Sequence, residues 1–126
     1  MEIEKLVGLG FSEDYARELL PQIDEDFYAA LTDSTLYDIY SKSFGILKEL
    51  GFDEDMMIEL WCDYEGAFTI GADILRRRLE ELREAVGEYW LDVLTEEYED
   101  YGESRCFDLL STLPSDKVWN KYISQL

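Results

Sequence analysis

The fold is decided by residues 70–101, which read IGADILRRRLEELREAVGEYWLDVLTEEYEDY and form the longest periodic segment of the sequence. Its apolar residues step by four, three, four, three and four positions: Leu75, Leu79, Leu82, Val86, Tyr89 and Val93. That spacing is the a/d seam of a heptad repeat and indicates a helix with one buried side. We therefore expect one helix of about 30 residues, about 45 Å long. Gly87 lies off the seam, where a glycine weakens a helix by about 1 kcal/mol and permits a kink.

Shorter helices with clear start and stop signals are predicted on both sides of this segment. The expected N-caps before it are Ser12, Asp24, Ser34 and Asp53. The expected short helices cover residues 3–7, 12–20, 24–31, 34–50, 53–65 and 105–113, and a last one starts at Pro114–Ser115. No strand pattern, linker or low-complexity segment occurs. The sequence therefore predicts an all-α protein, a single domain over residues 1–126, whose six to eight helices form one bundle around the long helix at 70–101.

A Leu-Gly-Phe corner occurs twice, at residues 9–11 and 50–52. The residues around the first corner recur 41 positions later: Leu6, Leu9, Gly10, Phe11, Glu13, Asp14, Glu18 and Leu19. Any two helices joined by a terminal glycine, an apolar residue and an N-cap produce this pattern. A common origin of the two segments is therefore one interpretation, and ordinary corner chemistry is the other.

The first 31 residues, and more loosely residues 44–61, resemble the ubiquitin-associated (UBA) domain. That family is a three-helix module whose Met/Leu-Gly-Phe/Tyr loop contacts an apolar patch on ubiquitin. The resemblance implies that Leu9-Gly10-Phe11 is a protein-interaction corner. The second copy departs from the family, because the long helix replaces a compact third helix.

The charge balance restricts the possible partners. Lys and Arg total 11 against 30 Asp and Glu, which gives a formal net charge of −19 without any histidine. Nucleic acids and anionic membranes are bound through clustered Lys and Arg, so direct binding to either is not expected. No secretory signal and no membrane-spanning apolar run occurs, which favours a soluble protein of the cytoplasm. The expected partner is a basic surface, including the groove of a nucleic-acid-binding protein.

The sequence offers no constellation of residues for catalysis, so we expect no enzyme and no catalytic, cofactor-binding or metal-binding residues. Histidine, the commonest general base and neutral metal ligand, is absent. Cys62 and Cys106 have no base partner and no zinc-ligand spacing, and we interpret both as small core residues. No glycine-rich phosphate loop or calcium-loop spacing occurs. Acidic pairs such as Glu80–Glu81 are expected by chance among 30 acidic residues.

The only basic cluster is Arg76-Arg77-Arg78 with Arg83. One interpretation is a docking patch for an anion. The favoured interpretation is a set of ion pairs on a surface helix, because acids lie three or four residues from each arginine. The expected pairs are Asp73–Arg77, Arg76–Glu80, Arg77–Glu81 and Glu80–Arg83. Residues 71–87 then carry no net charge, since four acids balance four bases.

The second half of the long segment has no such balance. Between Glu84 and Glu103 there is no Lys or Arg, and acids spaced by four residues repel one another along a helix. A local rule that is broken repeatedly is typical of a functional site, and tyrosines beside the acids are typical of interface anchors. The predicted partner-binding residues are Glu84, Glu88, Asp92, Glu96, Tyr98, Glu99, Asp100, Tyr101 and Glu103.

A row of carboxylates along a helix is similar to the phosphate row of a nucleic-acid strand. In size, charge and helix content the chain resembles the small acidic inhibitors of phage and mobile elements, of the anti-restriction or anti-CRISPR type. The resemblance implies an inhibitor that occupies the basic groove of a DNA- or RNA-binding enzyme. Two other interpretations are that the acids form a solvated face of an ordinary domain, or that they reflect a halophilic source. The five Lys and 18 aromatic residues argue against a halophilic source, because halophilic surfaces are poor in lysine and large apolar residues.

Overall fold

The computed structural model describes residues 3–126, which form nine α-helices and two short 3-10 helices without a strand. In chain order the elements are α1 (Glu4–Gly8), α2 (Glu13–Leu19), η1 (Leu20–Gln22), α3 (Glu25–Thr32), α4 (Ser34–Glu49), α5 (Glu54–Asp63), η2 (Glu65–Phe68), α6 (Ala72–Val86), α7 (Trp90–Tyr101), α8 (Arg105–Ser111) and α9 (Asp116–Ser124). The all-α prediction is confirmed. The expected six to eight helices are too few, because the long predicted helix is divided.

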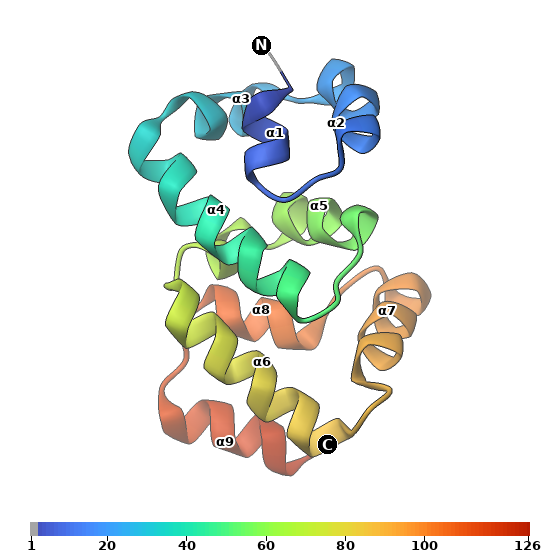
Figure 1. Ribbon diagram of the computed structural model, residues 1–126. Coiled ribbons are helices and arrows are strands. Elements are labelled where there is room, and N and C mark those ends of the chain that lie inside the picture. Colours follow the sequence, from blue (N-terminus) through green and yellow to red (C-terminus); the bar gives the residue numbers. More distant parts are fainter. Residues whose placement is uncertain (1–2) are drawn as a thin grey trace.

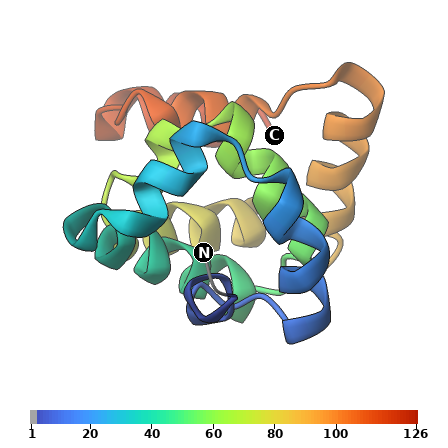
Figure 2. The same cartoon turned by 90° about the horizontal axis from the view of Figure 1, so that it is seen from above.

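The two halves of the chain occupy two ends of the molecule (Figure 1). Helices α1 to α3 lie at one end, α4 and α5 follow, and α6, α8 and α9 lie at the other end. Helix α7 stands at one side, and the view from above also places it at the margin (Figure 2). Aromatic side chains join the layers: Phe44 lies 5.5 Å from Phe11 and 4.9 Å from Phe68 between ring centroids.

Most helices begin where a Ser or Asp side chain accepts a backbone N–H of the first turn, as N-caps do. The capping residues are Ser12, Asp24, Asp33, Asp53, Ser104 and Ser115. The prediction of Ser34 as a cap is wrong by one residue. Asp33 caps α4 instead, since its carboxylate accepts the N–H groups of Thr35 and Leu36 at 3.0 Å.

The prediction of one long helix over residues 70–101 is wrong. Gly87 has φ 104° and ψ −167°, a conformation that essentially only glycine adopts, and it separates α6 from α7. The heptad seam stops at the same place, because Tyr89 is 67% exposed and Val93 is 46% exposed. Trp90 and Leu94 are buried in their stead. The Trp90 and Phe52 rings pack in a T-shaped arrangement, with 5.6 Å between centroids.

The two Leu-Gly-Phe corners have the same backbone and lie against each other. In each, the glycine has a positive φ and the phenylalanine N–H donates to the carbonyl five residues earlier, as in a Schellman motif. Lys48 Nζ of the second corner donates to the Gly10 carbonyl at 2.7 Å. The backbone N–H of Ser12 donates to the Glu54 carboxylate at 3.0 Å. The repeat in the sequence is therefore a repeated helix corner in the structure.

Candidate binding surface on helix α7

The acids of α7 form an exposed face. Asp92, Glu96, Glu99 and Asp100 all lie on α7 and are exposed to solvent. Gly102 ends the helix in the left-handed conformation, with φ 69°, and the exposed Glu103 follows directly. Five of the nine predicted partner-binding residues are therefore acids of one short segment.

The first two predicted acids do not belong to this row. Glu84 lies near the end of α6, and Glu88 lies in the break between α6 and α7. Both are exposed. The continuous stripe expected from Glu84 to Glu103 is wrong, because the conformation of Gly87 changes the direction of the chain between them.

The two predicted aromatic anchors differ from each other. Tyr101 is 78% exposed and is available to a partner. Tyr98 is half-buried, and its hydroxyl donates to the Asp63 carboxylate and, at 3.2 Å, to the Glu59 carbonyl. Burial first, and then the hydrogen bond to Asp63, raise the pKa of Tyr98 well above its usual range. Tyr98 thus joins α7 to α5, and its role as an interface anchor stays a prediction.

This contact brings a second set of acids beside α7. A groove of about 290 Å³ between the two helices is lined by Asp53, Asp55, Met56, Glu59, Thr95, Tyr98 and Glu99. We name the exposed acids of α7 and the acids of this groove the α5–α7 acidic face. The sequence analysis did not predict the α5 members as binding residues, because it assigned Asp53 only as an N-cap. No spacing along the chain signals that α5 packs on α7.

The α7 acids lack compensation by bases. Within residues 3–126, every ion pair of 4.0 Å or less involves other residues. The last turn of α7 contains no basic residue, although the negative end of the helix dipole lies there. Glu96 and Asp100 are also four residues apart, and such like-charge pairs are unfavourable by a few tenths of a kcal/mol. These acids therefore oppose the helix that carries them.

Not every acid near this face is available to a partner. Asp53 caps α5 through the Met56 N–H at 2.8 Å, and Asp55 accepts the Tyr15 hydroxyl at 2.8 Å. Glu97 accepts the backbone N–H of Arg105 at 2.6 Å. The acids of this face without such a structural contact are Glu59 of α5 and the α7 residues that the sequence singled out, and this separates structural from candidate binding carboxylates.

The two cysteines differ in their burial. Cys106 is buried, and its burial raises the pKa of the thiol, whereas Cys62 is exposed and not the core residue predicted. Among residues 3–126, no three His, Cys, Asp or Glu side chains are grouped so that they could hold a metal ion. No helix in this part of the chain is long and apolar enough to cross a membrane.

Comparison of the chain with protein-family models, with curated proteins and with solved structures finds no match.

Proposed function

We propose that the protein is a non-enzymatic binding protein that occupies the basic groove of a DNA- or RNA-binding enzyme with its α5–α7 acidic face. A restriction-type or CRISPR-type enzyme is the class of target that fits best. The observation that carries the proposal is the uncompensated row on α7. Residues 88–104 contain seven acids and no base, while the preceding residues 71–87 balance their charges.

The physical argument rests on where the charge is placed. A solvated face needs only a net charge, and interspersed acids and bases serve solubility equally well. The α7 acids instead lie together, next to the groove acids of α5, and those of the last turn, Glu99 and Asp100, act against the helix dipole. A surface of this kind raises the rate at which a basic partner associates, because the potential of the summed charges steers the encounter. The exposed Tyr101 at the end of α7 supplies an aromatic side chain for contact with the partner.

The alternative is a protein-interaction module that uses the UBA-like corner. In the structure, Leu9 and Phe11 are each only 2% exposed, and Phe11 stacks on Tyr15 with 5.5 Å between ring centroids. A corner whose apolar side chains are already buried offers little apolar surface to a partner. The burial therefore favours the acidic face over the corner as the binding surface.

The test replaces three acids of the last two turns of α7 in one variant, Glu96→Gln/Glu99→Gln/Asp100→Asn. The chain is used to capture proteins from a lysate. Each captured DNA- or RNA-binding protein is then titrated against its own labelled nucleic acid in the presence of the chain. We expect the wild-type chain to displace the nucleic acid. The variant should compete about tenfold more weakly and with a smaller dependence on salt, since three steering charges are lost.

The matched control removes three acids elsewhere, Glu18→Gln/Glu25→Gln/Asp26→Asn on α2 and α3 (Figure 1). It changes the net charge by the same amount but leaves the acidic face intact. The control should compete nearly as well as wild type. Equal weakening by both variants would assign the effect to net charge alone. If the captured proteins keep their nucleic acid in the presence of the wild-type chain, the proposal is wrong.

A further inference from the structure

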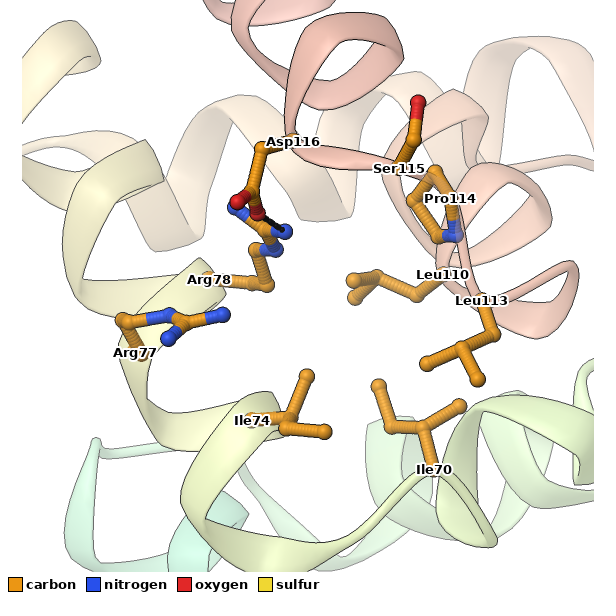
Figure 3. A pocket seen from close by; sticks show the side chains of 9 residues that line it. All are labelled: Ile70, Ile74, Arg77, Arg78, Leu110, Leu113, Pro114, Ser115 and Asp116. Atoms are coloured by element: carbon orange, nitrogen blue, oxygen red, sulfur yellow. Dashed lines mark hydrogen bonds and ion pairs between the residues drawn. The ribbon is translucent and has the colours of Figure 1, made fainter.

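A pocket of about 300 Å³ opens where the start of α6 meets the loop between α8 and α9 (Figure 3). One part of its wall is apolar and consists of Ile70, Ile74, Leu110, Leu113 and Pro114. The other part is polar and consists of Arg77, Arg78, Ser115 and Asp116. Its volume lies at the small end of the range of about 300–1,000 Å³ for ligand pockets, which suits a compact ligand.

Arg78 forms a fixed side of this pocket. The predicted surface position of this residue is wrong, because Arg78 is only 5% exposed. Its guanidinium donates to the Asp116 carboxylate at 2.6 Å, lies 3.5 Å from Glu81 and stands 5.4 Å from the centroid of the Trp119 ring. The same contact holds the pKa of Asp116 below its usual range. With its charge paired and its position set by these contacts, Arg78 is part of the wall.

Arg77 is different, because its guanidinium is largely unused. Its one ion pair within residues 3–126 joins Nε to the Glu81 carboxylate at 3.8 Å, which is too long for a hydrogen bond. The Arg77 side chain is 60% exposed, and Figure 3 shows its guanidinium extending toward the open space between the apolar wall and Asp116. A guanidinium presents paired N–H donors in a plane that matches a carboxylate.

The rim of the pocket also carries an exposed leucine in an unusual conformation. Leu113 has φ 49°, and it is the only non-glycine residue with positive φ among residues 3–126. A leucine in this conformation costs about 1–2 kcal/mol. The side chain is nevertheless 57% exposed, so the core gains little from it. It contributes apolar surface beside the arginine instead.

The charge around this pocket differs from the average of the chain. Residues 71–87 have no net charge, so the whole net charge of −19 lies outside α6. The residues that line the pocket comprise two arginines and one aspartate. Within residues 3–126 it is one of two pockets where an anion would meet cationic side chains at an apolar surface, the other being lined by Arg105 and Lys121 with Leu109 and Val118.

From these observations we propose that the pocket binds a compact amphipathic carboxylate, which pairs with Arg77 and places an aliphatic or aromatic group against Ile70, Ile74 and Leu113. A free carboxylic acid and the carboxyl end of a peptide with an apolar last residue both have this chemistry. The proposal is independent of the α5–α7 acidic face, because it concerns the opposite end of α6 from α7 (Figure 1).

The test uses two pairs of probes in methyl NMR titrations of the full chain. Isocaproate and isocaproamide differ only in the replacement of the carboxylate by a neutral amide, and N-acetyl-leucine and N-acetyl-leucinamide differ in the same way for a chain end. We expect both carboxylates to shift the methyl resonances of Ile70, Ile74, Leu110 and Leu113, and to bind at least tenfold more tightly than their amides. Tighter binding of isocaproate identifies a free acid as the ligand type, and tighter binding of N-acetyl-leucine identifies a chain end.

Two variants and one control localise the binding. Arg77→Gln should weaken carboxylate binding at least tenfold and leave the amides unaffected. Leu113→Asn should weaken all four probes several-fold, and asparagine tolerates the left-handed conformation. The control Arg83→Gln removes the same charge from the same helix outside the pocket and should bind like wild type. The proposal is overturned if no carboxylate shifts these methyl groups at about 10 mM, if the amides bind equally well, or if Arg77→Gln binds like wild type.

Discussion

The break between α6 and α7 depends on Gly87, and Gly87→Ala tests it directly. A Cβ added at this position meets nothing within 4 Å, so the effect of the substitution comes from the backbone alone. Alanine at φ 104° and ψ −167° costs about 1–3 kcal/mol. The lower entropy of the unfolded alanine chain returns about 0.4–1 kcal/mol. We therefore expect Gly87→Ala to lower the free energy of unfolding by about 1–2 kcal/mol.

Gly45→Ala is the matched control, because Gly45 lies inside α4 and its added Cβ also meets nothing within 4 Å. Here alanine stabilises the helix by up to about 1 kcal/mol. The two variants should therefore shift the free energy of unfolding in opposite directions, as measured by urea denaturation followed by far-UV circular dichroism. If Gly87→Ala is as stable as Gly45→Ala, residue 87 is helical. The chain would then contain the single long helix that the heptad spacing predicts.

Four further predictions follow from the packing and the charges. Stability should rise as NaCl increases from low concentration to about 0.2 M, because salt screens the repulsion at a net charge of −19; flat or falling melting temperatures would contradict this. Phe11→Ala should destabilise the protein by about 3–5 kcal/mol in urea denaturation, because the ring is buried against Phe44; a loss below about 1 kcal/mol would show that Phe11 is not a core residue. Tyr98→Phe should cost about 1 kcal/mol near neutral pH, through the lost hydrogen bond to Asp63. Because the pKa of Tyr98 is raised in the folded state, its contribution to stability is complete below about pH 10 and is lost as the pH rises through the folded-state pKa. The stability difference between Tyr98→Phe and wild type should therefore shrink in urea titrations at alkaline pH. A difference that grows with pH would refute the assignment. Glu96→Gln/Glu99→Gln/Asp100→Asn should be as stable as wild type or up to about 1 kcal/mol more stable in the same denaturation assay, because unfavourable charges leave the end of α7; clear destabilisation would mean that these acids have partners in the fold.

The sequence was sufficient for the helix class and for most helix boundaries, because these depend on local chemistry. Ser12, Asp24 and Asp53 cap helices as expected, and Gly51 and Gly102 follow helix ends with positive φ. The long helix failed for a tertiary reason. In an unbroken helix, Tyr89 and Val93 would lie on the buried heptad seam. In the structure, Trp90 is buried instead and packs on the Phe52 ring. The spacing of residues along the chain does not reveal that contact, and a glycine alone lowers helix stability by only about 1 kcal/mol.

The candidate site was predicted in part for the same reason. The α7 acids were visible, because a run of carboxylates without a base is a property of the sequence itself. The role of Tyr98 was not visible, because it depends on Asp63, which lies 35 residues away in the chain. The burial of Arg78 depends in the same way on Asp116, 38 residues away. Only packing distinguishes Arg78 from its exposed neighbour Arg77.

The break at Gly87 separates the two proposed binding sites. In a continuous helix, Glu84, Glu88, Asp92 and Glu96 would form one row that extends the neutral half of the segment. In the folded chain, the turn at Gly87 takes the seven acids of residues 88–104 away from α6 and places Glu99 and Tyr98 against the acids of α5. The acidic face therefore gains groove carboxylates from a distant segment. The arginines of α6 make their contacts elsewhere. Arg78 pairs with Asp116, Arg76 pairs with Glu49, and Arg77 lines the pocket. One glycine thus separates the surface that we propose for a basic partner from the pocket that we propose for an anion.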